Sequence, residues 1–360
     1  MGNTYKKTTK DQLRRHWLAL IAALLVLATF LIWAAYAERQ TLMEANRIHL
    51  AGNVRIAAGI LSRQLEAADG RLSALLRDYP EWSRRRDGWR EASSRMKGRI
   101  AMVPGVRTLL LLDADGKALA SNHDAMIGRN FAHRLYFTRA RQASDSAVRV
   151  LSPPFQGVLG DRVFTLSRRI DGPGGEFLGV VAATFDTDFF TESVKPLLFA
   201  PDVRFLFAHG EGAIISALPL DPAQKAIEAI AQYPESPLAR HLAGGMAESL
   251  TTGLSPLTDG LRLAAFHNVR PASLNLDAVL VVGTSRTLDG IFAAWRHEII
   301  MKALAFTLVA ALASIGFALY QRQQRAASAL SDLNQRYLDT AQTLLVALDK
   351  EGCITMGHLE

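Results

Sequence analysis

Two long apolar runs constrain this chain more than any other feature of its sequence. Residues 17–37 and 303–320 are 21 and 18 residues without a charged side chain. At a rise of about 1.5 Å per residue, each run can cross the roughly 30 Å hydrocarbon core of a bilayer, the second with help from Ile299 and Ile300. A surface helix of a soluble protein would show a polar stripe, which neither run has. We therefore expect two transmembrane helices, at 17–37 and 299–320.

The basic residues gather beside the first run. Residues 1–16 hold five Lys or Arg and one Asp, a net charge of +4, whereas 38–298 carries +3. By the positive-inside rule the leader 1–16 lies in the cytoplasm, and Arg322 and Arg325 mark the second cytoplasmic edge. The segment 38–298 then lies outside. Because that segment is nearly balanced in charge, the basic excess of the chain does not indicate nucleic-acid binding.

A cleaved export signal is the alternative for the first run. Ala35-Tyr36-Ala37 has the small-x-small form of a signal-peptidase site. The apolar region of a cleavable signal is usually about 7–15 residues long, and this run is longer. We therefore expect an uncleaved anchor. Cleavage after Ala37 would instead release a secreted protein, such as a hydrolase, and the mass of the mature chain distinguishes the two.

Cysteine is almost absent from the chain. The single Cys353 lies in the tail, so the outside segment has no disulfide and no thiolate ligand. The nine histidines are scattered without ligand spacing, and we expect no metal and no cofactor. Arginine outnumbers lysine and alanine is abundant, which suggests a GC-rich bacterial genome. The outside compartment would then be the periplasm, and the anchoring membrane the bacterial inner membrane.

Helical periodicity continues beyond the first run. Apolar residues recur every three or four positions over 61–79, and Leu42, Ala45 and Ile48 or His49 begin a similar stripe. Pro80 should end this helix. A helix over 38–79 would be about 60 Å long. That length indicates a stalk that also packs along a domain.

Three stretches show an apolar strand, a polar turn with glycine and a second short strand, which is typical of a β-hairpin. They are 109–121, 204–216 and 344–355, with Gly116, Gly212 and Gly352 at the turns. The carboxylates before Gly116 could suggest a calcium loop, but the other ligands of an EF-hand are missing. We therefore expect them to serve the turn.

Strand pairs follow the first two hairpins, at 163–185 and 261–285. This order predicts an α+β fold in which a long N-terminal helix carries two tandem antiparallel-sheet modules between the transmembrane helices. The distal module covers about 90–190 and the proximal module about 200–288. Residues 220–260 are expected to form a helix and loops of the proximal module.

Short motifs in the outside segment resemble those of double Cache sensor domains. They are VPGV at 103–106, IGRN at 127–130, RLYFTRA at 134–140, SPPF at 152–155, LSRRI at 166–170 and GVV at 179–181. The resemblance covers most of 38–298 and is strongest in the first module. It implies two PAS-like modules outside the membrane, with a small ligand bound in the membrane-distal one.

Catalytic motifs are missing from the sequence. There is no Gly-x-Ser-x-Gly elbow, no His-Glu-x-x-His and no Walker loop. Carboxylates occur singly, so no acid/base pair can be picked out. We therefore expect this chain to bind a ligand rather than to be an enzyme.

The best binding candidates lie on 130–140, a predicted helix. An arginine in a concave apolar pocket suits a carboxylate, because its planar fork of donors matches both oxygens, and a tyrosine adds a wall and a hydroxyl. The resemblance implies that Arg134, Tyr136, Phe137 and Asp186 form the ligand site, Asp186 matching an aspartate that holds the amine of amino-acid ligands. Amino-acid sensors of this class have Trp-Tyr where this chain has Tyr136-Phe137, so the ligand is either a small carboxylate or an amino acid.

The tail continues as a third apolar pattern. From Ala326 to Leu344, apolar residues alternate in steps of four and three, which predicts a parallel coiled coil over 321–343 and hence a homodimer. An amphipathic helix on the membrane surface is the alternative. Residues 344–360 resemble the truncated start of a cytoplasmic PAS domain.

These patterns together predict an inner-membrane receptor for signal transduction. The resemblance is closest to receptors that continue into PAS and then diguanylate cyclase (GGDEF) or histidine-kinase domains, whose motifs the tail does not contain. The alternative is a membrane-anchored periplasmic binding or interaction protein without signalling output, which would not need the coiled-coil pattern.

Overall fold

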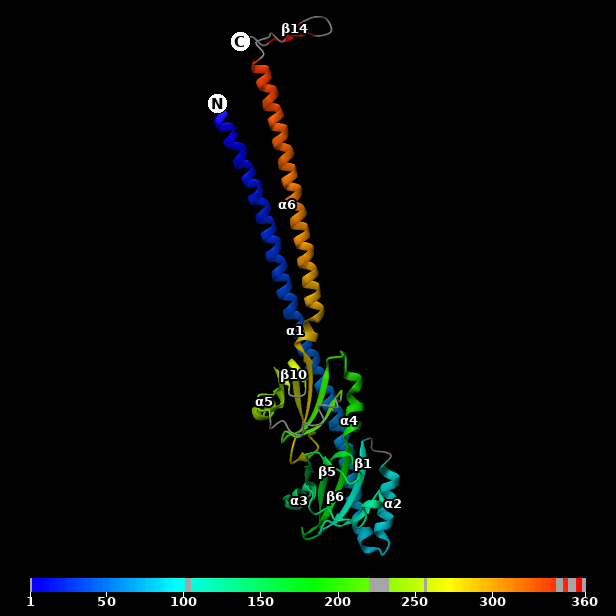
Figure 1. The fold of residues 1–360 in the computed structure, drawn as a ribbon. Coiled ribbons are helices and arrows are strands. Elements are labelled where there is room, and N and C mark those ends of the chain that lie inside the picture. The colour runs from blue at the N-terminus through cyan, green and yellow to red at the C-terminus, as the bar shows by residue number, and fades with distance from the viewer. Residues whose placement is uncertain are drawn as a thin grey trace. The chain divides into compact units, whose positions relative to one another are not determined.

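The computed structural model describes residues 2–100, 105–219, 233–255, 258–340, 346–348 and 354–357. The chain divides into two compact units. One is Gln40–Ala293, which we call the two-module unit, and the other joins Met1–Arg39 with Ala294–Glu360. A long N-terminal helix, two sheet modules and a long C-terminal helix make up the fold, which confirms the predicted α+β class (Figure 1).

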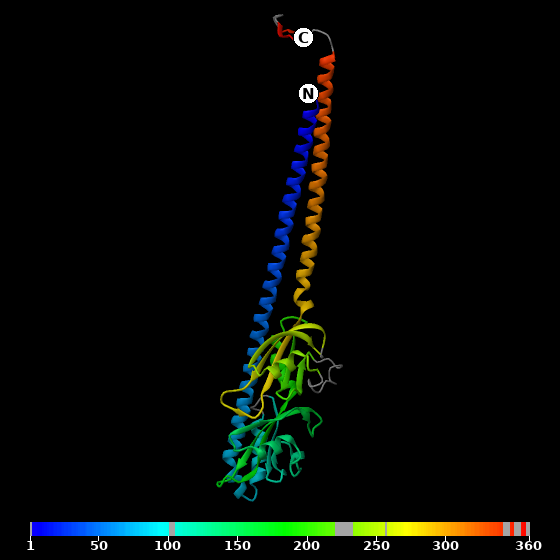
Figure 2. The ribbon, with the colours of Figure 1, turned by 90° about the vertical axis from the view of Figure 1, so that its left-hand side faces the viewer.

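Two long helices form most of the second unit. They are α1 (Gly2–Arg84) and α6 (Leu288–Thr340), which both continue into the two-module unit. Each contains a stretch long and apolar enough to cross a membrane. Figure 2 shows the two helices side by side. Trp17 of α1 donates a hydrogen bond to Gln321 (3.1 Å), and Lys302 of α6 contacts Glu38 (3.1 Å), so the helices run antiparallel.

The part of α1 in the two-module unit buries one stripe of side chains. Its fully buried residues recur at helical spacing, as predicted for 61–79: Leu50, Val54, Ala57, Leu61, Leu65, Ala68, Leu72 and Leu75. The stripe expected to begin at Leu42 is wrong, because Ala45 and Ile48 are exposed. Asn46 and Leu50 face inward there instead. The side-chain oxygen of Asn46 accepts a hydrogen bond from Arg286 (2.8 Å), which explains a polar residue on the buried face.

Pro80 does not end this helix, which continues to Arg84. A proline inside a helix removes one hydrogen bond and strains the preceding turn. Here only four residues follow it, and one of them, Trp82, is fully buried. We attribute the extra turn to the packing of this indole. A second helix, α2 (Gly88–Ile100), which the sequence did not reveal, then packs on strands β1 and β2.

The distal module contains a seven-stranded sheet in the order β11-β3-β5-β6-β1-β2, with β4 paired to β5. Its strands are β1 (Val106–Asp113), β2 (Ala118–Ser121), β3 (Val148–Leu151), β4 (Phe155–Gln156), β5 (Arg162–Asp171), β6 (Phe177–Asp186) and β11 (Asn275–Leu276). The last of these comes from the proximal part of the chain and pairs with β3 in parallel. Its other elements are η1 (Asp124–Met126) and α3 (Leu135–Gln142), and α4 (Thr187–Val194) and η2 (Lys195–Leu197) lead out of it.

The turn between β1 and β2 confirms the hairpin expected at 109–121. Gly116 has φ +82°, which favours glycine, and a Cβ there would meet the backbone of Ala132 at 2.6–2.7 Å. The carboxylate of Asp113 accepts hydrogen bonds from the backbone N–H groups of Asp115 (3.0 Å) and Lys117 (2.8 Å). The carboxylate of Asp113 therefore stabilises the turn.

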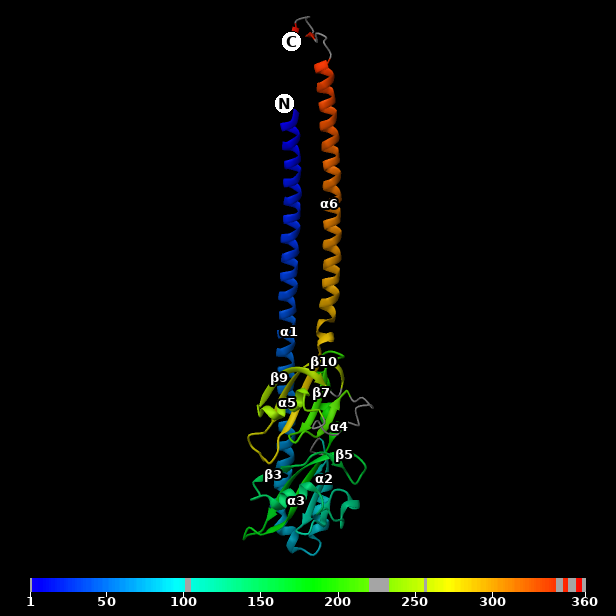
Figure 3. The same cartoon turned by 60° about the vertical axis from the view of Figure 1, so that its left-hand side comes forward.

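The proximal module contains a five-stranded sheet in the order β8-β7-β12-β10-β9. Its elements are β7 (Arg204–His209), β8 (Ile214–Leu218), α5 (Pro237–Gly244), β9 (Glu248–Ser255), β10 (Thr258–Val269) and β12 (Leu280–Thr287). Figure 3 shows α3 and α5 in front of the sheets and α1 behind them. The prediction of a helix and loops for 220–260 was wrong for β9, whose exposed, alternating residues resemble a loop in sequence. Residues 220–232 of that segment lie outside the described residues.

The third hairpin pairs β13 (Val346–Leu348) with β14 (Ile354–Gly357). This agrees with the strand pattern predicted at 344–355, although the turn itself lies outside the described residues. Within 321–343, α6 is helical as far as Thr340. The further course of the predicted coiled coil lies outside the described residues.

Candidate functional site

A pocket lies over one face of the distal sheet. Three structural parts line it: strand residues Arg107, Thr108, Leu110, Val163 and Thr184, the segment that enters α3 with Met126, Phe131, Arg134 and Tyr136, and the segment Phe155, Gly157, Val158, Leu159 and Asp161. Its cavity volume is about 40 Å³, room for about three water molecules. A ligand in this conformation would therefore be small.

Register places the strand residues on the same sheet face. Thr108 of β1 is paired with Thr184 of β6, and Leu110 with Ala182. Paired residues in an antiparallel sheet point to the same side, and every second residue joins them. Val163 of β5 is paired with Asp186, two residues beyond Thr184. Asp186 therefore belongs to the pocket face, at the end of its strand.

Arg134 is the N-cap residue of α3 and lies outside the helix. The helix predicted over 130–140 begins only at Leu135, because Arg134 has extended backbone angles (φ −79°, ψ 138°). Asn130 precedes it in an isolated β-bridge with Lys117, and its side-chain amide donates to the carbonyl of Asp115 (2.9 Å). The extended backbone at Arg134 lets its side chain reach the pocket. Its guanidinium lies 4.9 Å from the centre of the Phe155 ring, a cation–π contact.

Tyr136 lines the pocket as a nearly fully buried side chain. Its ring lies 5.8 Å from that of Phe155. Burial raises the pKa of the Tyr136 phenol, and the nearby Arg134 charge opposes this only in part. The phenol is therefore neutral at physiological pH and can donate or accept one hydrogen bond. Arg134, Tyr136 and Phe155 thus form one wall of the pocket.

Phe137 points elsewhere. It is buried in the core between α3 and the sheet, where its ring makes an edge-on contact with Phe177 at 5.9 Å, and it is not among the residues that line the pocket. The neighbouring positions 136 and 137 on α3 thus have different structural roles. Tyr136 borders the pocket, and Phe137 fixes the helix to the sheet.

Asp186 acts at the edge of the pocket through Arg107. Its carboxylate caps α4 by accepting from the backbone N–H of Asp188 (2.9 Å), and it lies 3.6 Å from the Arg107 guanidinium. Arg107 itself lines the pocket and forms an ion pair with Asp161 on the opposite segment. The structure thus brings Arg134 and Tyr136 into the pocket. Asp186 does not line the pocket but contacts Arg107, which does.

Sequence reasoning missed Arg107, Phe155 and Asp161 as pocket residues. Arg107 is the second residue of β1, two positions after Gly105, and Asp161 directly follows another glycine with positive φ, Gly160. Both patterns are typical of ordinary surface turns. Only the pairing of β1, β5 and β6 shows that they meet. Among the described residues, no group of three His, Cys, Asp or Glu side chains is arranged to hold a metal ion.

The fold can be compared with solved structures. The extracellular domain of a protein described as histidine kinase rpHK1S-Z16 matches 70% of this chain and 99% of its own length, at 20% identity and a TM-score of 0.59. The ligand-binding domain of the Pseudomonas aeruginosa PAO1 amino-acid chemoreceptor PctB, in complex with L-Arg, matches 69% of this chain and 98% of its own length (17% identity, TM-score 0.52).

A third match is the ligand-binding domain of the Campylobacter jejuni chemoreceptor Tlp3 in complex with L-valine. It covers 70% of this chain and 97% of its own length, at 15% identity and a TM-score of 0.50. No protein-family model matches the sequence, and no curated protein is significantly similar to it. The similarity is thus one of fold: the two-module unit folds like these extracellular ligand-binding domains, in agreement with the predicted double Cache-like fold.

Proposed function

We propose that this chain is a membrane receptor whose outside segment binds a small carboxylate or amino acid in the distal pocket. The observation that carries the proposal is Arg134, whose guanidinium lines the pocket beside Tyr136. Among the described residues it forms no ion pair with a carboxylate, and its cation–π partner Phe155 is neutral. An arginine in such a position can bind a ligand carboxylate through two parallel hydrogen bonds.

The remaining charges favour an amino acid. Arg107 lies between two carboxylates, those of Asp161 and Asp186. With Arg134, the pocket and its edge carry two positive and two negative side chains. Such a site suits a zwitterion, with the ligand carboxylate at Arg134 and the ammonium group at Asp161.

The four residues expected from the sequence receive different roles in this proposal. Arg134 and Tyr136 contact the ligand, the first as the carboxylate partner and the second as a wall with a hydroxyl. Asp186 orients Arg107 from the edge of the pocket, and Phe137 holds α3 in place from the core. Two matched receptors have amino-acid ligands, L-valine or isoleucine in Tlp3 and L-Arg in PctB, which supports the same ligand class here.

The proposal includes the membrane arrangement. Residues 17–37 and 299–320 would span the bacterial inner membrane, with 1–16 in the cytoplasm and 38–298 in the periplasm. The polar contacts Trp17–Gln321 and Glu38–Lys302 bracket about 20 residues of each helix, which is about 30 Å. Residues 321–343 would pair in a homodimer, and 344–360 would begin a PAS domain that passes the signal to a cyclase or kinase output.

Thermal unfolding of the full chain in lipid nanodiscs tests the ligand proposal. L-alanine and L-valine are the probes, and at least one should raise the unfolding temperature. Arg134→Ala should abolish the increase, whereas Arg129→Ala, a change at an exposed arginine outside the pocket, should retain it. A full increase in the Arg134→Ala chain, or no increase with either probe in the unchanged chain, would overturn the proposal.

A further inference from the structure

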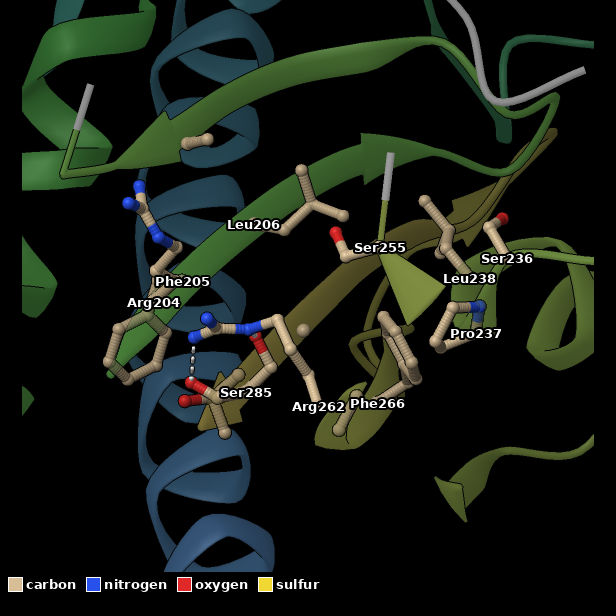
Figure 4. Close-up of a pocket in the computed structure, with 14 residues that line it drawn as sticks. Arg204, Phe205, Leu206, Ser236, Pro237, Leu238, Ser255, Arg262, Phe266 and Ser285 are labelled. Carbon is tan, nitrogen blue, oxygen red and sulfur yellow. Dashed lines mark hydrogen bonds between the residues drawn. The ribbon is translucent and has the colours of Figure 1, made fainter. Parts of the chain in front are cut away.

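A second pocket lies in the proximal module, between the sheet and α5 (Figure 4). Its cavity volume is about 50 Å³. The register of β7, β10 and β12 places Leu206, Ala264 and Gly283 on its floor. Of these floor residues Ala264 is small, and the Phe266 ring lies over Gly283. From the other side, Pro237 and Leu238 of α5 close the pocket.

A buried cation lies at one end of this pocket. Arg262 of β10 is only 2% exposed. Its guanidinium donates to the hydroxyl of Ser285 (3.0 Å), to the Ser285 backbone carbonyl (3.1 Å) and to the backbone carbonyl of Asp202 (2.5 Å). All three acceptors are neutral. A charge removed from water is costly unless a counter-charge compensates it.

The nearest carboxylate is already engaged. Asp202 accepts hydrogen bonds from the side chain of Arg286 (3.1 Å) and from the hydroxyl (2.9 Å) and backbone N–H (3.1 Å) of Thr287. Among the described residues, the hydrogen bonds of Arg262 use Nε and Nη2, and none uses Nη1. Burial lowers the pKa of Arg262 to about 10, the neighbouring Arg204 adds to the effect and the Asp202 charge opposes it, so the side chain remains charged at neutral pH.

The lining of this pocket carries net positive charge. Arg204 and Arg262 both line it, and the lining residues include no Asp or Glu. The distal pocket differs, because there Asp161 lies beside Arg107. A site with two cations and no carboxylate selects an anion over a zwitterion.

The other end of the pocket is apolar. Leu206, Leu238 and Phe266 line it, and Figure 4 shows Leu238 and Phe266 away from the guanidinium of Arg204. A Cβ at position 283 would lie 2.5 Å from the Phe266 ring, so Gly283 allows this ring to lie flat against the sheet. The pocket thus combines a cationic end with a short apolar end.

We propose that the proximal pocket is a second binding site, which takes a small monocarboxylate with a short alkyl chain. The carboxylate would receive hydrogen bonds from Arg262 and Arg204, and the alkyl chain would lie between Phe266 and Leu238. Its modest volume limits the ligand to a few non-hydrogen atoms. The site is separate from the distal pocket, since the two share no lining residue.

Calorimetric titration of the full chain in nanodiscs with propionate tests this assignment. Arg262→Met removes the charge and keeps an unbranched side chain. It should weaken propionate binding about 10- to 100-fold, the range expected for losing hydrogen bonds to a charged group. Arg134→Met should leave this binding component in place, because Arg134 belongs to the distal pocket. The exposed Arg270 provides the matched control, and Arg270→Met should bind as the unchanged chain does.

A second variant covers the case in which Arg262→Met does not fold. Ala264→Leu fills the pocket floor and leaves the guanidinium in place, and it should also abolish propionate binding. The assignment is overturned if propionate does not bind, if binding is lost in Arg134→Met alone, or if a folded Ala264→Leu chain binds as well as the unchanged chain. Because the distal proposal is tested through Arg134 and amino acids, the two can fail independently.

Discussion

At the scale of single residues, the Asp161–Arg107 ion pair allows a test of the proposed amino-acid ligand. Asp161 lines that pocket and is paired with Arg107. If it holds the ammonium group of an amino acid, Asp161→Asn should weaken L-alanine binding about tenfold or more, because a charge-assisted hydrogen bond becomes a neutral one. Calorimetric titration measures the change. Asp115→Asn, at an exposed turn carboxylate, is the control, and equal affinity in both variants would mean that Asp161 does not hold the ligand.

A buried histidine, His209, should make the stability of the fold depend on pH. His209 is fully buried, and its Nε2 lies 3.1 Å from the Leu151 carbonyl. The backbone N–H of Glu211 donates to Nδ1 (3.2 Å), so Nε2 carries the proton and both ring nitrogens are satisfied in the neutral form. Burial lowers the pKa of His209, against the opposing effects of the Leu151 hydrogen bond and of the Glu211 and Asp277 charges, while Arg139 lowers it further.

The lowered pKa of His209 determines the direction in which the free energy of unfolding changes with pH. Below the unfolded pKa of about 6.5, the unfolded chain binds a proton that the folded chain resists, so the free energy of unfolding should fall as the pH drops from 7 to 5. His241, whose pKa burial also lowers, contributes in the same direction. Burial raises the pKa of Asp277, so this group opposes the trend.

Urea unfolding of the segment 38–298 at several pH values measures this dependence. His209→Gln should flatten the slope and lower the stability at pH 7 by about 1–3 kcal/mol, because one of the two buried hydrogen bonds is lost. A slope equal to that of the unchanged segment would contradict the role of His209.

At the scale of elements, α1 supplies one wall of the core. Leu65 is fully buried, whereas Ile48, on the same helix, is 64% exposed. Leu65→Ala should therefore lower the free energy of unfolding of 38–298 by about 2–5 kcal/mol, through lost burial and the cavity it leaves. Ile48→Ala should change it by less than about 0.5 kcal/mol. Urea unfolding of the two variants measures both changes. Equal losses of unfolding free energy would contradict the packing of this stripe.

The same helix shows what the sequence can and cannot predict. A stripe of apolar residues at a period of 3.6 predicts the buried face around Leu65, because local spacing determines it. Asn46 on the inner face depends on Arg286, which lies 240 positions further along the chain. The end of α1 beyond Pro80 depends on the burial of Trp82. Such long-range contacts leave no local signal.

The pocket residues also differ in whether the sequence alone could predict them. Arg134 and Tyr136 could be predicted because they share one short motif that resembles a known family. Arg107 and Asp161 are brought to the same pocket by the pairing of three strands, and each closely follows a glycine with positive φ, which suggests a surface loop. A strand such as β9, exposed along much of its length, likewise has too little apolar alternation to distinguish it from a loop.

At the scale of the whole molecule, the proposed receptor must pass a signal through α6. The side chains of Leu330, Leu333 and Tyr337 are 66%, 51% and 70% exposed, and they lie at the spacing of four and three that a coiled coil requires. A row of large apolar side chains exposed in one chain is accounted for if a second copy covers it. This supports the proposed homodimer.

Disulfide crosslinking of the full chain in membranes tests that arrangement. In a Cys353→Ser background, Leu330→Cys should form a crosslinked dimer under mild oxidation, because the two residues of a pair would face each other across the helix interface. Ser328→Cys, on the opposite side of the helix, should crosslink far less. If the receptor transmits ligand binding, L-alanine should change the Leu330→Cys yield while leaving the Ser328→Cys yield low. Equal crosslinking yields at both positions would argue against a dimer through this face of α6. A Leu330→Cys yield that L-alanine does not change would argue against signal transmission.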